Sequence, residues 1–128
     1  MTERNVLLEL RQLKKHFPIT SGLFRRVVGH VKAVDGVSLY LRQGETLGLV
    51  GESGCGKTTT ARCVTRLAEP TAGEILYHRN GKPEDIAALD PSRMKNVRKD
   101  IQIIFQDPVS SLNPRMLVFD IIGEPLLI

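Results

Sequence analysis

Short apolar segments recur along the chain at spacings that predict β-strands. Residues 33–41 alternate between apolar and polar positions, so that Val37, Leu39 and Leu41 share one face of an extended segment. Residues 46–50 are almost continuously apolar, which is typical of a strand buried on both faces. Further strands are predicted at residues 6–10, 74–77 and 101–105, whereas residues 21–31, which contain two glycines, are predicted to form a loop or insert.

Helical periodicity appears in two places between these strands. Residues 57–69 carry apolar residues at helical spacing, place Arg62 and Arg66 together on one face, and are followed by the helix-ending Pro70. Residues 91–99 form a second predicted helix, with Asp90 as the candidate N-cap before a proline. An Asn-Gly pair at residues 80–81 predicts a tight turn. Residues 107–114 are predicted to form a loop, and the chain then ends in an apolar stretch without a stop signal.

Composition narrows the class of protein. The 128 residues correspond to one ordinary domain at most, and no apolar run reaches the length of about 18 residues that a membrane span needs. The N-terminus shows no secretory signal, which favours the cytosol.

No acidic residue lies between Glu9 and Asp35, while six basic residues do. Such a stretch attracts nucleic acid, anionic lipid or phosphate ligands, although a solvated face is the commoner reason for it. Because tryptophan is absent and aromatic residues make up only 5% of the chain, an aromatic nucleic-acid groove is poorly supported and no nucleic-acid partner is expected.

Cysteines and histidines offer little sign of a disulfide or a metal site. Cys55 and Cys63 are eight residues apart, which along a helix is a rise of about 12 Å, beyond the roughly 7 Å that a disulfide allows. Both are therefore expected to be unpaired thiols, with Cys55 the more reactive because it precedes a helix N-terminus and a lysine. The three histidines have no metal-like spacing and are expected at the surface: His16, His30 and His78.

A glycine-rich segment between predicted strand 46–50 and predicted helix 57–69 carries the strongest chemical signal. Residues 51–58 read GESGCGKT and fit the P-loop pattern G-x-x-x-x-G-K-[ST]. Glycines let the backbone approach a phosphate group closely, and successive N–H groups then point toward the anion. Lys57 is expected to reach the β- and γ-phosphates, and the Thr58 hydroxyl to bind Mg²⁺. The candidate nucleotide-binding residues are Gly51, Glu52, Ser53, Gly54, Cys55, Gly56, Lys57, Thr58 and Thr59.

Several motifs around this loop resemble the ATP-binding subunits of ABC transporters. They are Leu13-Lys14-Lys15-His16-Phe17, Ala33-Val34-Asp35-Gly36-Val37-Ser38 and Glu69-Pro70-Thr71-Ala72-Gly73. The most specific stretch is similar to the dipeptide and oligopeptide importer branch, which includes nickel importers: Phe105-Gln106-Asp107-Pro108, continued by Ser111-Leu112-Asn113-Pro114-Arg115-Met116. The resemblance implies an α/β fold: a P-loop NTPase core of the ABC ATPase type with an antiparallel β-subdomain, truncated before its parallel sheet is complete. Residues 1–105 would form the β-subdomain and P-loop core, and residues 106–128 the Q-loop and the start of a helical subdomain.

The resemblance also implies roles for individual residues. Phe17 corresponds to the aromatic residue that stacks on adenine, and Gln106 to the Q-loop glutamine that contacts Mg²⁺ and the attacking water. Lys57 and Gln106 are therefore the catalytic candidates, Thr58 and Gln106 the metal ligands, and ATP with Mg²⁺ the implied cofactors. The implied partners are a second ATP-binding subunit and transmembrane permease subunits. The implied place is the cytoplasmic face of the cell membrane, where ATP hydrolysis would energise peptide import.

The chain ends before the rest of the family's catalytic motifs. The signature motif, the Walker B aspartate, the catalytic glutamate and the switch histidine all follow the Q-loop in this family, and none precedes Ile128. We therefore expect the isolated chain to bind ATP but to hydrolyse it negligibly, and its unpaired strands to favour association. Three alternatives stay open: a nucleotide-binding module without turnover, another P-loop enzyme such as a small-molecule kinase, and a non-catalytic piece that docks on a membrane partner.

Overall fold

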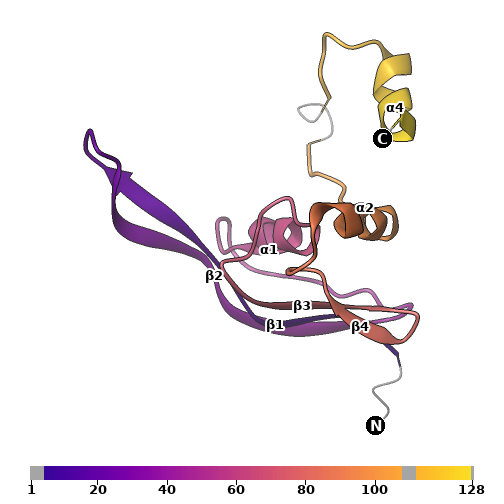
Figure 1. The fold of residues 1–128 in the computed structure, drawn as a ribbon, viewed down its shortest axis with the longest axis horizontal. Coiled ribbons are helices and arrows are strands. Elements are labelled where there is room, and N and C mark those ends of the chain that lie inside the picture. Colours follow the sequence, from indigo (N-terminus) through magenta and orange to yellow (C-terminus); the bar gives the residue numbers. More distant parts are fainter. Residues whose placement is uncertain (1–4, 108–111, 128) are drawn as a thin grey trace.

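A four-stranded antiparallel sheet forms the centre of the computed structural model, which describes residues 5–107 and 112–127. Its strand order is β2-β1-β3-β4. The strands are β1 (Val6–Ser21), β2 (Arg26–Arg42), β3 (Ala72–Arg79) and β4 (Lys82–Asp85). Helices α1 (Lys57–Val64) and α2 (Pro91–Asp100) cover one face of this sheet, and α4 (Val118–Leu127) follows near the C-terminus (Figure 1). The expected antiparallel β-subdomain is thus confirmed.

The core lies between the sheet and the two helices. Strand β1 pairs with both β2 and β3, so its alternating apolar side chains lie at the middle of the buried face. The buried apolar residues come from β1, β2, β3, both helices and the segment between β4 and α2: Leu10, Leu13, Val34, Cys63, Ile75, Tyr77, Ile86, Leu89, Met94 and Val97. No helix among residues 5–107 and 112–127 is long and apolar enough to cross a membrane.

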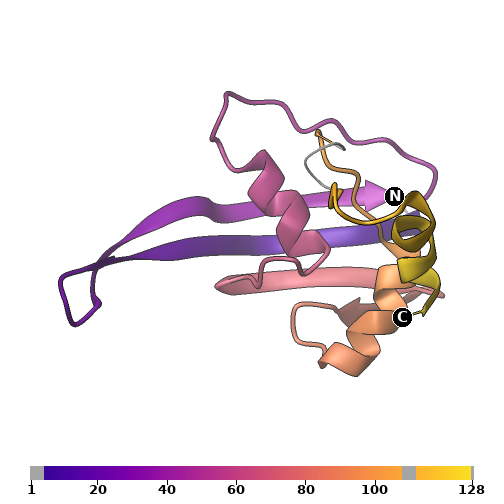
Figure 2. The same ribbon diagram turned by 90° about the horizontal axis from the view of Figure 1, so that it is seen from above.

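The segment 21–31, predicted as a loop or insert, is instead mostly strand. Strands β1 and β2 continue past the body of the molecule as one long hairpin, with Ser21 paired to Arg26 at its end (Figure 2). The turn is closed by the Arg25 N–H, which donates to the Gly22 carbonyl at 3.1 Å. The prediction was wrong because the segments on either side of this turn pair with each other, and their ladder satisfies backbone groups that the two glycines had suggested lie in a loop.

Two predicted strands, 46–50 and 101–105, are not strands in the structure. Residues 45–50 form an irregular segment between the end of β2 and the glycine-rich loop (Figure 2). Leu47 and Val50 in this segment are 43% and 98% exposed. A fully buried parallel strand needs neighbouring strands and helices on both faces, and the described residues supply neither for these segments. Both segments nevertheless line one apolar groove of about 210 Å³ against α1, which brings Leu49 and Ile103 onto the same surface.

The predicted helix 57–69 ends early, at Val64. Thr65 forms its C-cap, and Arg66 has a left-handed backbone with φ of 52°. The Arg66 guanidinium turns away from α1 and donates to the carbonyls of Ile86 and Leu89 at 3.2 and 2.6 Å. Arg62 and Arg66 therefore do not share a helix face, because a tertiary contact with the loop before α2 determines the direction of Arg66.

The predicted turn between β3 and β4 and the predicted N-cap of α2 are both confirmed. Asn80 and Gly81, with φ of 53° and 75°, form the two-residue turn of the β3–β4 hairpin, in which Arg79 pairs with Lys82. The Asp90 carboxylate accepts hydrogen bonds from the N–H groups of the two residues after Pro91 at 2.9 and 3.0 Å. The pKa of Asp90 is lowered by the hydrogen bonds that its carboxylate accepts, chiefly the one from the Ser92 side chain. Residues 108–111 of the predicted loop 107–114 lie outside the described residues.

Candidate nucleotide-binding site

The glycine-rich loop is packed directly against the β1–β2 hairpin. Gly56 has φ of 95°, and a Cβ on it would lie 2.2 Å from the Ala33 carbonyl oxygen of β2. Only glycine allows this close approach of two backbones. Gly54, with φ of 81°, makes the other left-handed bend of the loop. The loop thus ends at a point fixed on the sheet, and α1 begins immediately after it.

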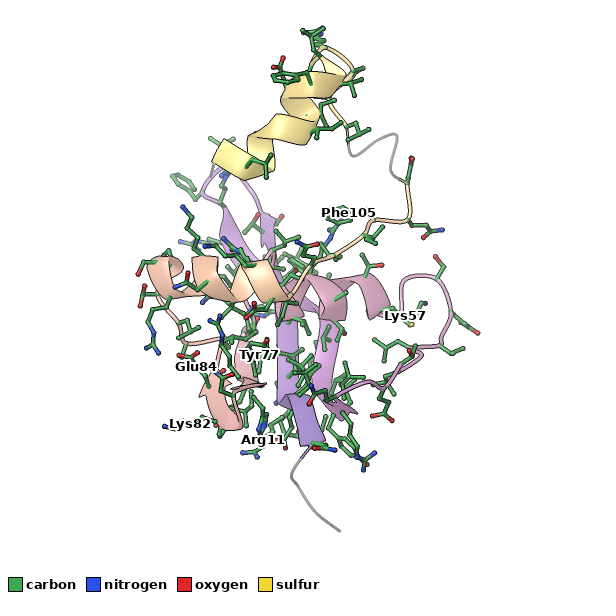
Figure 3. All side chains as sticks on the ribbon, turned by 90° about the vertical axis from the view of Figure 1, so that its right-hand side faces the viewer. Arg11, Lys57, Tyr77, Lys82, Glu84 and Phe105 are labelled. Atoms are coloured by element: carbon green, nitrogen blue, oxygen red, sulfur yellow. The ribbon has the colours of Figure 1, made fainter. Side chains whose placement is uncertain are left out.

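Lys57 is the first residue of α1, and its ammonium group lies within the loop. The Nζ atom donates to the carbonyl oxygens of Gly51 and Glu52 at 2.7 and 2.6 Å, and to the Cys55 Sγ at 3.3 Å. Figure 3 shows Lys57 on the side of the molecule where this loop projects. A lysine ammonium has three donors, and sulfur is the weakest of these three acceptors. An incoming anionic oxygen would therefore replace the Cys55 contact at the smallest cost.

The N-terminus of α1 adds to the positive character of the loop. The first turn of α1 contains no acidic residue, so its unpaired N–H groups and the positive end of its dipole face no carboxylate of their own helix. Thr58 is exposed and Thr59 is half-buried, whereas the Thr60 hydroxyl is used internally and donates to the Gly56 carbonyl at 3.0 Å. Of the three consecutive threonines, Thr58 therefore offers the accessible hydroxyl.

Gln106, far from the loop in sequence, lines the same cavity as Thr58 in the structure. Both residues line one open cavity of about 610 Å³ between α1 and the segment 101–107. The same cavity contains Arg62, whose guanidinium lies 6.0 Å from the centre of the Phe105 ring. Sequence analysis assigned no part in this site to Arg62. Its spacing of four residues from Thr58 was the available signal, because such residues share one face of a helix.

Phe17 lies on the hairpin close to where the loop is attached. It pairs with Val31 on β2, two residues before the Ala33 that Gly56 contacts. The ring is 43% exposed, and the Lys15 ammonium lies 4.9 Å from its centre. Lys15 is a second neighbour that sequence analysis did not single out, although alternation along a strand puts residues 15 and 17 on one side. The hairpin therefore presents an exposed aromatic ring and a cation near the loop.

The two cysteines differ as expected. Both are free thiols; Cys55 is exposed in the loop, and Cys63, a residue of α1, is fully buried. Burial raises the pKa of the Cys63 thiol above its usual value. The histidine prediction is only partly right. His16 and His78 are half-buried, and His16 Nε2 is 3.0 Å from an Asp35 carboxylate oxygen, whereas His30 is exposed.

The geometry gathers groups that suit a polyanionic ligand and a hard cation. An ammonium group, helix N–H groups and a flexible glycine backbone can bind several phosphate oxygens, and an exposed aromatic ring lies next to them. A hydroxyl and an amide oxygen share the adjoining cavity. Comparison with known proteins adds relatives by sequence and neighbours by fold.

The sequence comparisons concern proteins of peptide transport. The chain is 57% identical over 128 residues to the oligopeptide transport ATP-binding protein AppF of Bacillus subtilis, which covers 98% of the chain. It is 47% identical over 129 residues to the dipeptide transport ATP-binding protein DppF of Escherichia coli, which covers 99% of the chain. The chain spans only 38% and 36% of the lengths of these two relatives.

Fold comparison and a family model agree with the sequence relatives. A dimeric post-hydrolysis state of an ATP-binding cassette with ADP and Pi matches 94% of the chain with a TM-score of 0.70 at 23% identity, and the chain covers 47% of that protein. At this identity the match shows the fold alone. The ABC transporter family model matches residues 34–122, from the hairpin through the loop, α1 and the Gln106 segment. Because that match includes well over half of the chain, the protein belongs to the ABC transporter family.

Proposed function

We propose that this chain is the N-terminal part of the ATP-binding subunit of a peptide importer and that its glycine-rich loop binds MgATP. The observation that carries the proposal is the position of the Lys57 ammonium within the loop, 2.7 Å from the Gly51 carbonyl, at the N-terminus of α1. The names of the relatives AppF and DppF support ATP binding and the peptide class of substrate. Family membership makes a small-molecule kinase the weaker alternative.

The nucleotide would contact three parts of the chain. The phosphates would lie on the loop, residues 51–58, with Lys57 donating to the terminal phosphates and Thr59 near the inner ones. Phe17 would stack on adenine through the ring face that Lys15 leaves open, an interaction of about 1–3 kcal/mol for a base on an aromatic ring. Glu52, Ser53 and Cys55 would contribute backbone N–H groups, whatever the direction of their side chains.

Thr58 and Gln106 fit a Mg²⁺ site by the chemistry of their donors. Mg²⁺ prefers oxygen ligands and is commonly held by one or two protein groups together with substrate phosphates. Thr58 and Gln106 offer a hydroxyl and an amide oxygen on one cavity. In the described part of the chain, no three His, Cys, Asp or Glu side chains form a metal-binding group. When bound, Mg²⁺ would neutralise charge that develops on the phosphates.

Turnover and transport would belong to the intact subunit. Phosphoryl transfer depends on groups positioned from several parts of an enzyme. The 128-residue chain spans 38% of the length of AppF, and for the chain by itself we propose nucleotide binding without turnover. The dimeric cassette that shares its fold supports a second ATP-binding subunit as one partner. Transmembrane permease subunits would be the others, with the assembly at the cytoplasmic face of the membrane. Residues 106–128 would begin the helical subdomain of the family.

Labelling of the two cysteines tests nucleotide binding in the folded chain. We expect a maleimide to react with exposed Cys55 and to spare Cys63, which is fully buried. Saturating MgATP is expected to slow the reaction at Cys55 severalfold, because phosphates on the loop would cover the thiol and engage Lys57. The rate at each cysteine is followed by mass spectrometry of peptides from the labelled protein.

Cys63 serves as the internal control in this experiment. If MgATP slows both cysteines equally, the nucleotide stabilises the whole fold rather than covering the loop. Labelling of Cys55 that ignores saturating MgATP would contradict binding at the glycine-rich loop. Magnesium adenosine diphosphate is expected to protect Cys55 as well, whereas magnesium chloride alone is not.

A further inference from the structure

The end of the β1–β2 hairpin exposes bulky apolar side chains far from the core. We call residues 19–28 the hairpin tip; Figures 1 and 2 show it projecting beyond α1 at one extreme of the molecule. Leu23 and Phe24, in the turn itself, are 98% and 87% exposed. Ile19, Val27 and Val28 are about half exposed beside them. None of these residues takes part in the proposed nucleotide site.

Apolar residues occupy both faces of the hairpin tip. Val27 and Val28 are neighbours on β2, so their side chains point to opposite faces of the ribbon, and both are exposed. A two-stranded ribbon on its own is only marginally stable in water. A flat partner would cover one face and leave the other in water. The pattern therefore fits a partner that surrounds the tip.

The hairpin tip carries positive charge and contains no acidic residue of its own. Arg25 and Arg26 follow the exposed Leu-Phe pair directly. The acids at the two ends of this part of the chain are engaged elsewhere: Glu9 with Arg11 at 2.7 Å, and Asp35 with His16 at 3.0 Å. An anionic partner would thus meet two arginines with no competing carboxylate between residues 10 and 34.

The backbone groups of the tip form hydrogen bonds with one another, so the tip can leave bulk water at a lower cost. The turn is closed by the hydrogen bond from the Arg25 N–H to the Gly22 carbonyl, and the ladder continues through Ser21 with Arg26 and Thr20 with Val27. Internal pairing of this kind lowers the cost of bringing backbone groups into an apolar boundary. The outer edges of the ribbon remain unpaired, which limits the tip to shallow entry.

We propose that the hairpin tip binds an anionic lipid bilayer, with Leu23 and Phe24 inserted at the acyl boundary and Arg25 and Arg26 on the lipid phosphates. A bilayer surrounds what enters it, and so it covers both apolar faces at once. Anionic headgroups supply negative charge that pairs with the two arginines. The contact lies outside the loop and the Gln106 cavity, so it is independent of nucleotide binding.

A tryptophan reporter tests insertion directly, because the chain has no tryptophan of its own. We expect the emission of Phe24→Trp to shift to the blue on adding vesicles of equal parts phosphatidylcholine and phosphatidylglycerol. Brominated acyl chains are then expected to quench it. Phe119→Trp, at an 84% exposed position of α4, is the matched control and is expected to change little. Emission from Phe24→Trp that these vesicles leave unchanged would overturn the proposal.

Sedimentation with the same vesicles separates the apolar contribution from the charge. Each of Leu23→Ser and Phe24→Ser is expected to weaken partitioning roughly tenfold. Arg25→Asn with Arg26→Gln is expected to weaken it roughly 30-fold, and asparagine tolerates the left-handed backbone at residue 25. Raising the salt concentration is expected to weaken binding of the unaltered chain as well.

Matched variants elsewhere on the surface provide the controls. Leu117→Ser with Phe119→Ser removes the same two residue types from exposed positions, and Lys82→Gln with Lys95→Gln removes the same charge. Both pairs are expected to leave partitioning nearly unchanged. Losses equal to those of the tip variants would overturn the proposal, as would equal binding to vesicles of pure phosphatidylcholine. Absence of binding to either vesicle would overturn it too.

Discussion

We expect the Lys57→Ala variant to bind MgATP roughly 10–150-fold more weakly than the unaltered chain, since losing a charge-assisted contact costs about 1.5–3 kcal/mol. The ammonium of Lys57 is the cation of the loop, and it also ties the Gly51 and Glu52 carbonyls together at 2.7 and 2.6 Å. Alanine removes both the phosphate partner and this tie. Isothermal titration calorimetry with MgATP measures the two affinities.

Lys82→Ala is the matched control for Lys57→Ala. It removes the same charge from an exposed site on β4, away from the loop, and is expected to leave the affinity for MgATP unchanged. Chemical unfolding of all three proteins separates a lost contact from a lost fold. Equal affinities of the unaltered chain and Lys57→Ala would remove the glycine-rich loop from the account of nucleotide binding.

The second large effect is expected from Gly56→Ala, which should lower the free energy of unfolding by roughly 3 kcal/mol or more and also impair nucleotide binding. A left-handed backbone costs an alanine about 1–2 kcal/mol by itself. In addition, the new Cβ would lie 2.2 Å from the Ala33 carbonyl oxygen, and neither backbone can yield without moving the loop off β2. Urea unfolding followed by circular dichroism measures the loss.

Gly81→Ala isolates the conformational part of that cost. Gly81 has φ of 75°, and nothing lies within 4 Å of the position its Cβ would take. We expect this variant to lose only about 1–2 kcal/mol. If Gly56→Ala and Gly81→Ala lose the same free energy, the close approach of the loop to Ala33 is not what requires glycine at residue 56.

Features that depend on neighbours in the chain were predictable from the sequence. The Asn80-Gly81 turn, the Asp90 cap and the start of a helix at Lys57 all follow from the backbone preferences and hydrogen bonds of adjacent residues. The glycine-rich loop belongs with them, because its pattern specifies both the glycine bends and the lysine. The family resemblance rests on these same local motifs, and the ABC transporter match over residues 34–122 confirms it.

Other features required contacts that no local pattern contains. The end of α1 at Val64 depends on Arg66 reaching the loop before α2, and the hairpin through residues 21–31 depends on pairing between two strands. Apolar runs such as 46–50 mark a segment that prefers burial, but a strand forms only where another strand offers hydrogen bonds. Sequence pattern could not show that.

For the candidate site, the sequence by itself determined the chemical groups, and only the tertiary structure decided how they meet. Lys57 and Thr58 are the first two residues of α1, directly after the glycine bends, so their positions follow from the pattern. The cavity that Gln106 shares with Thr58, and the place of Phe17 on the hairpin near the loop, depend on how separate segments pack and pair. Such contacts join residues far apart in the chain. They are selected by the burial of whole faces rather than by any one residue's preference.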